Sequence, residues 1–257
     1  MNRVILQRVI LFFISLLLFS SCMGEGRHVE TGQTFGVVRF DYKSGLNLLD
    51  VSEVDVFYSI RFKEAYEGNC FLIAYEIDFE RPENSFEMVN ATGYLTVDIL
   101  DKMDVDRWPV TSVTDTSQAM TNEVAIISPT YSGEFYYIKG MFFIISSLEI
   151  PTNQTMTWHL SYDMDNMMTE EYGQKYFNIY LRTTYVNPGT YSKETIGVAN
   201  AFEMKYLMEN IVKQVKEAGG ELFKFRIHYP SSISEDGQIK WDKQDTGEIR
   251  VEYIIPS

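Results

Sequence analysis

The 257-residue sequence has few of the residues that bind nucleic acids, ligate metals or form disulfide cross-links. It contains only 2 Cys and 3 His, and its 22 Lys and Arg side chains are outnumbered by 36 Asp and Glu, giving a net charge of -14. Affinity for nucleic acid comes from cations that neutralise phosphates, so this acidity argues against a nucleic-acid partner. The histidines, His28, His159 and His228, are far apart, and we expect none of them to be a ligand or base.

Catalytic motifs are missing as well. The sequence has no His-x-x-x-His, Cys-x-x-Cys, Gly-x-Ser-x-Gly or Gly-x-x-x-x-Gly-Lys pattern, which removes support for zinc-dependent, nucleophilic and nucleotide-dependent catalysis. The sequence does contain clusters of acidic residues, which could be solvated side chains in loops. The alternative is that they form a calcium site or the carboxylate pair of a glycosidase. We favour loop charge and predict no enzymatic activity, no cofactor and no metal site. The clusters are Asp101/Asp104/Asp106, Asp163/Asp165 and Glu170/Glu171.

Long apolar runs are also scarce, and the longest is at the N-terminus. Arg3 and Arg8 precede an apolar run of 11 residues, Val9 to Phe19. A membrane-spanning helix needs about 20 apolar residues, so this run predicts a secretory signal peptide over residues 1–21 rather than a membrane anchor.

A cysteine follows this run directly. The stretch Phe19-Ser20-Ser21-Cys22 resembles the lipobox of bacterial lipoproteins, in which the cysteine is lipidated and the peptide is cut before it. The alternative is an ordinary signal peptide that is cut nearby. Buried acyl chains contribute about 0.8 kcal/mol per methylene, so lipidation of Cys22 would make the membrane a permanent partner. We predict a lipid anchor on Cys22 and a polar, Gly-rich tether over residues 22–33.

Lipidation of Cys22 leaves Cys70 without an intrachain disulfide partner. The apolar residues that follow Cys70 predict a buried strand, so we interpret its thiol as a small core side chain rather than a nucleophile.

The rest of the chain is patterned as β-strands. Trp158, Leu160 and Tyr162 alternate with polar residues, which is typical of a strand with one face in a core, and we expect Trp158 to be buried. Strands follow one another with little helix between them, which favours an antiparallel sandwich or barrel. The strand-like segments are Phe35–Phe40, Val54–Ile60, Cys70–Phe79, Tyr94–Leu100, Glu123–Ile127, Phe135–Ile145, Thr155–Met164, Tyr176–Val186, Leu222–Tyr229 and Ile249–Ile255.

One segment has helical spacing instead. Asn200 is a candidate cap for a helix whose apolar residues recur every three or four positions up to Gly219, with Glu209 and Lys213 as a supporting pair. We expect its Met-rich stripe to pack on a sheet, with a membrane or partner contact as the alternative. Weak patterning between Asp101 and Asn122 suggests a domain boundary, so we predict domains over residues 34–115 and 116–257.

Tryptophans supply the one candidate binding site. Trp108 and Trp241 lie in polar stretches that we interpret as loops, where exposed rings would suggest binding of a glycan or a peptide.

The order of these features resembles the NigD-like lipoproteins of Bacteroidetes. Three stretches carry the resemblance: Thr34 to Arg39, Gly68 to Ile77, and Lys224 to Tyr229. The resemblance implies a mainly β protein, with a small OB-like β-barrel followed by an antiparallel β-sandwich that here has one amphipathic helix. It also implies a cell-envelope lipoprotein without known enzymatic activity, in some members linked to bacteriocin production or immunity.

Together these features predict a non-catalytic binding or interaction module held in the cell envelope, in the outer membrane of a Gram-negative bacterium. Its partner would be an envelope protein or a glycan. The alternative is a glycan-binding or glycan-active accessory protein.

Overall fold

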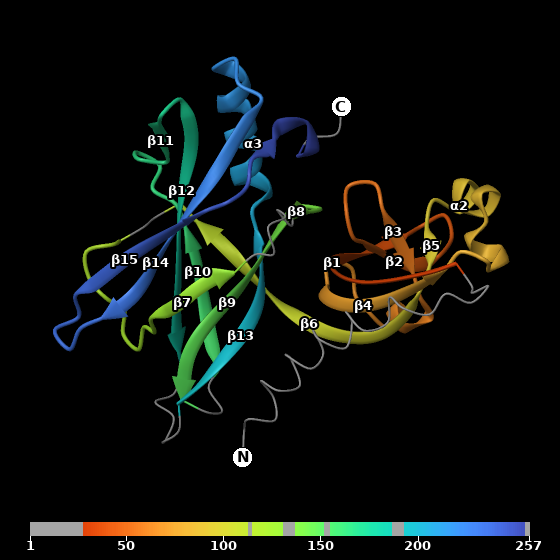
Figure 1. The fold of residues 1–257 in the computed structure, drawn as a ribbon, viewed down its shortest axis with the longest axis horizontal. Helices are drawn as coiled ribbons and strands as arrows, with labels where there is room; N and C mark the ends of the chain where they lie inside the picture. Colours follow the sequence, from red (N-terminus) through yellow and green to blue (C-terminus); the bar gives the residue numbers. More distant parts are fainter. Residues whose placement is uncertain (1–27, 113–114, 131–136, 152–154, 187–192, 255–257) are drawn as a thin grey trace.

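The computed structural model describes residues 28–112, 115–130, 137–151, 155–186 and 193–254. The predicted signal peptide and Cys22 lie outside these residues. The described chain folds into two β-rich bodies joined by one long strand (Figure 1). The strands of the N-terminal body are β1 (Val29–Asp41), β2 (Leu46–Asp50), β3 (Val56–Tyr58), β4 (Cys70–Asp78), β5 (Leu95–Thr96) and the first part of β6 (Asp98–Thr111).

The N-terminal body is a curved sheet with strand order β6-β4-β1-β2-β3-β5. β1 is central and pairs antiparallel with both β2 and β4, and its apolar residue Val38 points into a core with Leu49, Phe71 and Ile73. Two 3-10 turns (Ile60–Phe62 and Pro82–Asn84) and the short helix α2 (Phe86–Thr92) connect the strands.

β1 starts earlier than the sequence predicts. Val29 to Gln33 pair with β4 from Asp78 to Ala74, although we assigned these residues to the tether because they lack apolar periodicity. Backbone pairing to a neighbouring strand places them in the sheet, and pairing of this kind leaves no mark on the hydrophobic pattern.

The C-terminal body is a sandwich of two sheets. The first sheet has the strand order β15-β14-β12-β10 and continues into the end of β6; β11 also pairs with β12, and β16 with β14. In the second sheet, β13 lies between β6 and β9. β9 also pairs with β7 and with β8. The mainly β fold is as predicted, but the sheets are mixed, because β12 runs parallel to β14, and β6 runs parallel to both β10 and β13. The strands are β7 (Ile126–Thr130), β8 (Tyr137–Ile138), β9 (Met141–Pro151), β10 (Met156–Ser161), β11 (Met168–Glu171), β12 (Gln174–Tyr185), β13 (Lys193–Glu203), β14 (Leu222–Ile233), β15 (Ile239–Asp245) and β16 (Ile249–Arg250), followed by a 3-10 turn (Val251–Tyr253).

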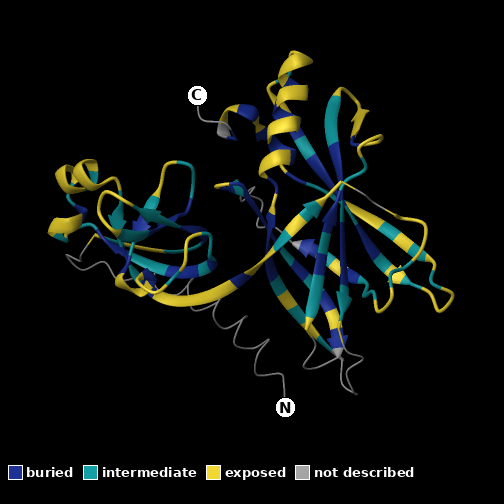
Figure 2. Cartoon of the chain, turned by 180° about the vertical axis from the view of Figure 1, so that it is seen from behind, coloured by how far each residue is buried: buried dark blue, intermediate teal, exposed yellow. Residues whose placement is uncertain are grey.

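The strand β6 belongs to both bodies. Its residues 98–105 pair with β4, whereas residues 106–109 pair with β13 and residues 110–111 with β10. The first half of the segment with the weakest hydrophobic pattern, in which we expected a boundary, is therefore part of a continuous strand. The pattern is weak because much of β6 is exposed where it passes between the bodies (Figure 2).

The helix α3 (Lys205–Glu217) covers one side of the sandwich. Leu207, Met208, Ile211, Val212 and Val215 are buried in the sandwich core, which confirms core packing of the apolar stripe. The predicted start at Asn200 is wrong, because β13 continues through Glu203 in its pairing with β9.

A buried cluster joins the two bodies. Phe35, Val37, Cys70 and Val105 of the N-terminal sheet pack with apolar residues of β8, β9 and β13, among them Phe143. Burial of apolar surface on both sides of the junction favours a fixed arrangement of the two bodies, in contrast to domains joined by an exposed linker.

Candidate functional site

Trp241 lies on strand β15 rather than in the loop that we predicted. Its partner across the ladder is Pro230, and the alternate residues of β14 that point inward, such as Ile227, belong to the sandwich core. Trp241 therefore lies on the outer face of the sheet. The ring is half-buried, and its Nε1 donates a hydrogen bond to the carbonyl of Thr116 at 3.3 Å.

Trp241 forms an aromatic cluster with Tyr180 and His228. The rings of Tyr180 and His228 stack with centroids 4.9 Å apart and an angle of 18° between their planes, and Trp241 meets Tyr180 edge-on at 5.7 Å. Tyr180 and His228 are register partners on β12 and β14, so they project from the same face of the sheet. This cluster is the candidate functional site.

The histidine of the cluster is held in its neutral form. Its Nε2 lies 2.9 Å from Oδ1 of Asn178, and burial, reinforced by the charge of Arg226, lowers the pKa of His228. Burial and nearby Arg182 likewise lower the pKa of His159 on β10. Neutral imidazoles of this kind suit packing and hydrogen bonding at pH 7 better than charge recognition.

A buried ion pair supports the cluster from one side. Arg182 on β12 bonds both oxygens of Glu123 at 2.6 Å, donates to the carbonyl of Gln118 at 2.8 Å and bonds the carbonyl of Asp115. Its guanidinium carbon is 5.6 Å from the Trp241 ring centroid. These bonds fix the segment that also accepts the indole hydrogen bond.

A second buried arginine holds the neighbouring strands. Arg226 bonds Asp245 at 2.7 and 3.0 Å and Glu171 at 2.7 and 3.2 Å, and its guanidinium lies 3.9 Å from the Tyr176 ring. The hydrogen bonds from Arg226 hold the pKa values of Asp245 and Glu171 below their usual range. Because both guanidinium groups are already bonded to carboxylates, their geometry suits them to fixing this face rather than to binding an anion.

Sequence reasoning missed both arginines. Each occupies an outward position on a strand, where the alternating pattern predicts a solvated polar residue. Their acidic partners are distant in sequence, and only strand pairing and the segment before β7 bring them together.

Trp108 lies on a different part of the sandwich. It is half-buried on β6, packs against the sandwich core, and donates from Nε1 to Oδ1 of Asn200 at 2.9 Å. The interpretation as an exposed loop residue is wrong, because pairing with β13 at Phe202 fixes this stretch as a strand. Trp108 therefore faces the space between the sheets, whereas Trp241 faces outward. Trp158 is 3% exposed, which confirms its predicted place in the core.

Cys70 is buried in the cluster that joins the two bodies. Burial raises the pKa of its thiol to about 12, which disfavours the reactive thiolate at neutral pH. The described residues contain no group of three or more His, Cys, Asp and Glu side chains placed to hold a metal ion.

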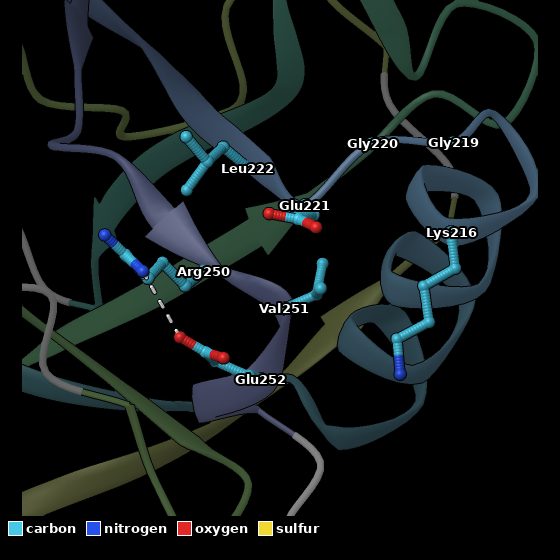
Figure 3. Close-up of a pocket in the computed structure, with 8 residues that line it drawn as sticks. All are labelled: Lys216, Gly219, Gly220, Glu221, Leu222, Arg250, Val251 and Glu252. Atoms are coloured by element: carbon cyan, nitrogen blue, oxygen red, sulfur yellow. Dashed lines mark hydrogen bonds and ion pairs between the residues drawn. The ribbon is translucent and has the colours of Figure 1, made fainter.

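A pocket of about 540 Å³ opens where α3 ends and β14 begins (Figure 3). Gly219 and Gly220 form one wall, Lys216 extends from the helix, and Arg250 is paired with Glu252 at 3.4 Å. The charges are mixed, and this pocket shares no residue with the aromatic cluster. A second pocket, of about 400 Å³, lies at the junction of the two bodies beside Tyr137 and Lys139.

Comparisons with known proteins identify the N-terminal body. Residues 26–103 match the family model described as a lipoprotein OB domain. A search of curated proteins found no match. No helix in the described ranges combines the length and the apolar character that a membrane crossing requires.

Solved structures share the fold of nearly the whole described chain. An uncharacterised protein from Parabacteroides merdae is 16% identical with a TM-score of 0.73, over 86% of this chain and 99% of its own. A putative lipoprotein from Bacteroides fragilis is 12% identical with a TM-score of 0.57, over 84% and 97%. A NigD-like immunity protein from Bacteroides caccae is also found, at 11% identity and a TM-score of 0.46, over 83% and 92%.

The family match over residues 26–103 agrees with the lipoprotein resemblance that the sequence motifs carry. Residues 26–103 match a lipoprotein OB domain, and a β-sandwich follows them in an arrangement shared with structures from Bacteroides and Parabacteroides.

Proposed function

We propose that this chain is a cell-envelope lipoprotein, anchored by lipid on Cys22, that binds another envelope protein without catalysing a reaction. The observation that supports this proposal best is the position of the OB domain in the sequence relative to Cys22. The lipoprotein OB domain begins at residue 26, directly behind the predicted lipobox at Cys22. A domain of this type so close to the cysteine favours a short tether to a membrane of the cell envelope, which we take to be the outer membrane.

The fixed junction between the two bodies supports a contact role. Phe35 and Phe143 are buried at the junction, and Arg107 on β6 bonds the carbonyl of Gly68 at 3.0 Å and pairs with Glu203. A rigid body on a short tether keeps its surfaces within a limited distance of the membrane, and preorganisation of this kind lowers the entropic cost of binding.

The test is cross-linking in intact envelopes. We expect the native chain to capture one envelope protein in a constant proportion. The yield should fall several-fold for a Cys22→Ala variant that has lost its lipid, while a Cys70→Ala variant should behave as the native chain does. Diffuse cross-links to abundant proteins, equal in all three, would contradict the proposal.

A second candidate function is glycan binding at the aromatic cluster. Stacked and edge-on rings on a sheet face are the usual material of sugar platforms, and Tyr180, His228 and Trp241 supply them. On a glycan array, Trp241→Ala should abolish binding and Trp108→Ala should retain it, since Trp108 faces the space between the sheets. Equal binding by the native chain and Trp241→Ala would rule this candidate out.

The immunity role implied by the sequence resemblance remains a prediction. A strain that lacks the protein should become sensitive to a bacteriocin that the parent strain tolerates. Unchanged sensitivity across bacteriocins made by related strains would count against this role.

A further inference from the structure

The helix α2 is the least buried element of the OB domain. None of its residues is buried, and Phe86 and Met88 are 83% and 44% exposed. Phe86 is the one phenylalanine among the large apolar side chains that stand exposed in the described ranges. A fully apolar ring in water, unlike an exposed tyrosine, has no polar atom to solvate.

This helix is nevertheless held in a defined shape. The Ser85 side chain accepts a hydrogen bond from the backbone N–H of Met88 at 3.4 Å, and Gly93 ends the helix in the left-handed region at φ 76°. A helix of seven residues is too short to persist alone, so both caps and the turn before it must hold it in place.

The turn before α2 is fixed to the sheet by Asn84. The buried Asn84 amide donates to the carbonyls of Asp78 and Thr96 at 3.0 and 2.8 Å and accepts from the backbone of Thr96 at 2.8 Å. Phe86 is therefore two residues from a rigid anchor point, and its exposure is a property of the folded domain.

The start of β1 lies at this same end of the domain. Val29 pairs with Asp78, and the carbonyl of His28 accepts a hydrogen bond from Phe79 at 2.9 Å. Figure 1 shows α2 beside the beginning of β1, at the end of the OB domain that points away from the sandwich.

The length of chain before β1 sets how far this end can be from the membrane. Five residues lie between Cys22 and His28. The six steps along an extended chain from Cys22 to His28 span at most about 22 Å. With lipid on Cys22, the end of the domain that carries α2 cannot leave the neighbourhood of the bilayer surface. A tether of this kind raises the effective concentration of a surface contact, so even a weak apolar contact is populated.

We propose that α2 docks on the bilayer surface, with the Phe86 ring in the interfacial region beside the lipid anchor. The contact sets the orientation of the rigid body, while the acyl chains supply the affinity. This inference rests on the proposed lipid anchor. Glu83 and Glu87 flank Phe86 and are exposed, so the surface that suits α2 is zwitterionic rather than anionic.

The chain allows a clean probe of this contact. Cys70 is 3% exposed with a pKa of about 12, so a thiol-reactive fluorophore should label an introduced surface cysteine and leave Cys70 untouched. Asn90→Cys places the fluorophore on an exposed position of α2, one turn from Phe86 on the same face, and leaves the Phe86 ring in place. Tyr206→Cys is the matched control, because Tyr206 is 81% exposed but lies on α3 in the sandwich.

The experiment uses the full mature chain in vesicles of phosphatidylcholine and phosphatidylethanolamine, with and without a doxyl-lipid quencher. We expect blue-shifted emission at position 90 and lipid quenching about twofold or more stronger than at position 206. Equal weak quenching at both positions, in protein that floats with the vesicles, overturns docking by α2 but leaves the anchor intact. A blue shift without lipid quenching would point to a protein contact and also overturns it. Protein that fails to float overturns the anchor, and docking with it.

Discussion

Phe35 of the OB domain stacks on Phe143 of the sandwich, with ring centroids 4.6 Å apart and an angle of 18° between the ring planes. Both rings are almost fully buried, at 3% and 1% exposure. They lie beside the strand β6, which pairs with both bodies, so a backbone connection and an apolar contact hold the same junction.

Loss of this stack should weaken both bodies together. We expect Phe143→Ala to cost about 3–5 kcal/mol of unfolding free energy, the usual range for a buried phenylalanine, in a single transition that reports on both bodies. Phe86→Ala is the matched control and should change stability by less than about 0.5 kcal/mol, because that ring is exposed. The measurement is denaturant-induced unfolding, monitored both by fluorescence and by circular dichroism. Two separate transitions in the native chain would contradict the coupling.

A pair of strand glycines tests the packing of the OB domain. A Cβ on Gly36 of β1 would lie 2.4 Å from the side chain of Leu49, whereas a Cβ on Gly197 of β13 would meet nothing within 4 Å. We expect Gly36→Ala to destabilise the protein by about 1–3 kcal/mol, as overpacking does, and Gly197→Ala to be neutral or slightly stabilising. The measurement is the thermal unfolding midpoint of each variant. Equal midpoints would show that the packing between β1 and β2 is loose enough to accept a methyl group at Gly36.

The fold was largely predictable from the sequence, because alternation of apolar residues marks strands wherever one face is buried. Prediction from this alternation succeeded for β10, where Trp158 and Leu160 are in the core. It failed for β6, whose residues are largely exposed, and for the first residues of β1. In both places backbone pairing decides the structure, and pairing leaves no periodic trace.

The candidate site was predictable only in part. Trp241 was identified by its residue type, but Tyr180 and His228 were not, because three strands contribute one ring each. The supporting arginines were missed for the same reason, since Arg182 and Glu123 meet only in the folded chain.

The Arg226 network should make stability depend on acid. Asp245 has a pKa below its ordinary value of 3.8 because Arg226 bonds it, so its contribution is present above that value and is lost as the pH falls through the lowered pKa. We expect Arg226→Met to cost about 1–3 kcal/mol at pH 7 and to flatten the loss of stability between about pH 4 and pH 2. The measurement is the midpoint of urea unfolding at a series of pH values across this range, for the native chain and for the variant. Parallel curves for the native chain and the variant would contradict the assignment.

Cys70 should be inert in the folded protein. Its pKa of about 12 leaves almost no thiolate at pH 8, and the side chain is 3% exposed. We expect reaction with an aromatic disulfide reagent to be at least about a hundredfold slower in the native state than in denaturant. Fast reaction in the native state would mean that the junction between the two bodies opens readily.

The chemistry of the mature N-terminus shows whether this protein is held to the membrane by lipid on Cys22. Mass spectrometry of the protein purified from its native membrane should find an N-terminal Cys22 that carries fatty acyl chains, and Cys22→Ala should lose them while Cys70→Ala retains them. An unmodified N-terminus at any position in the native protein would contradict a lipid-anchored envelope role.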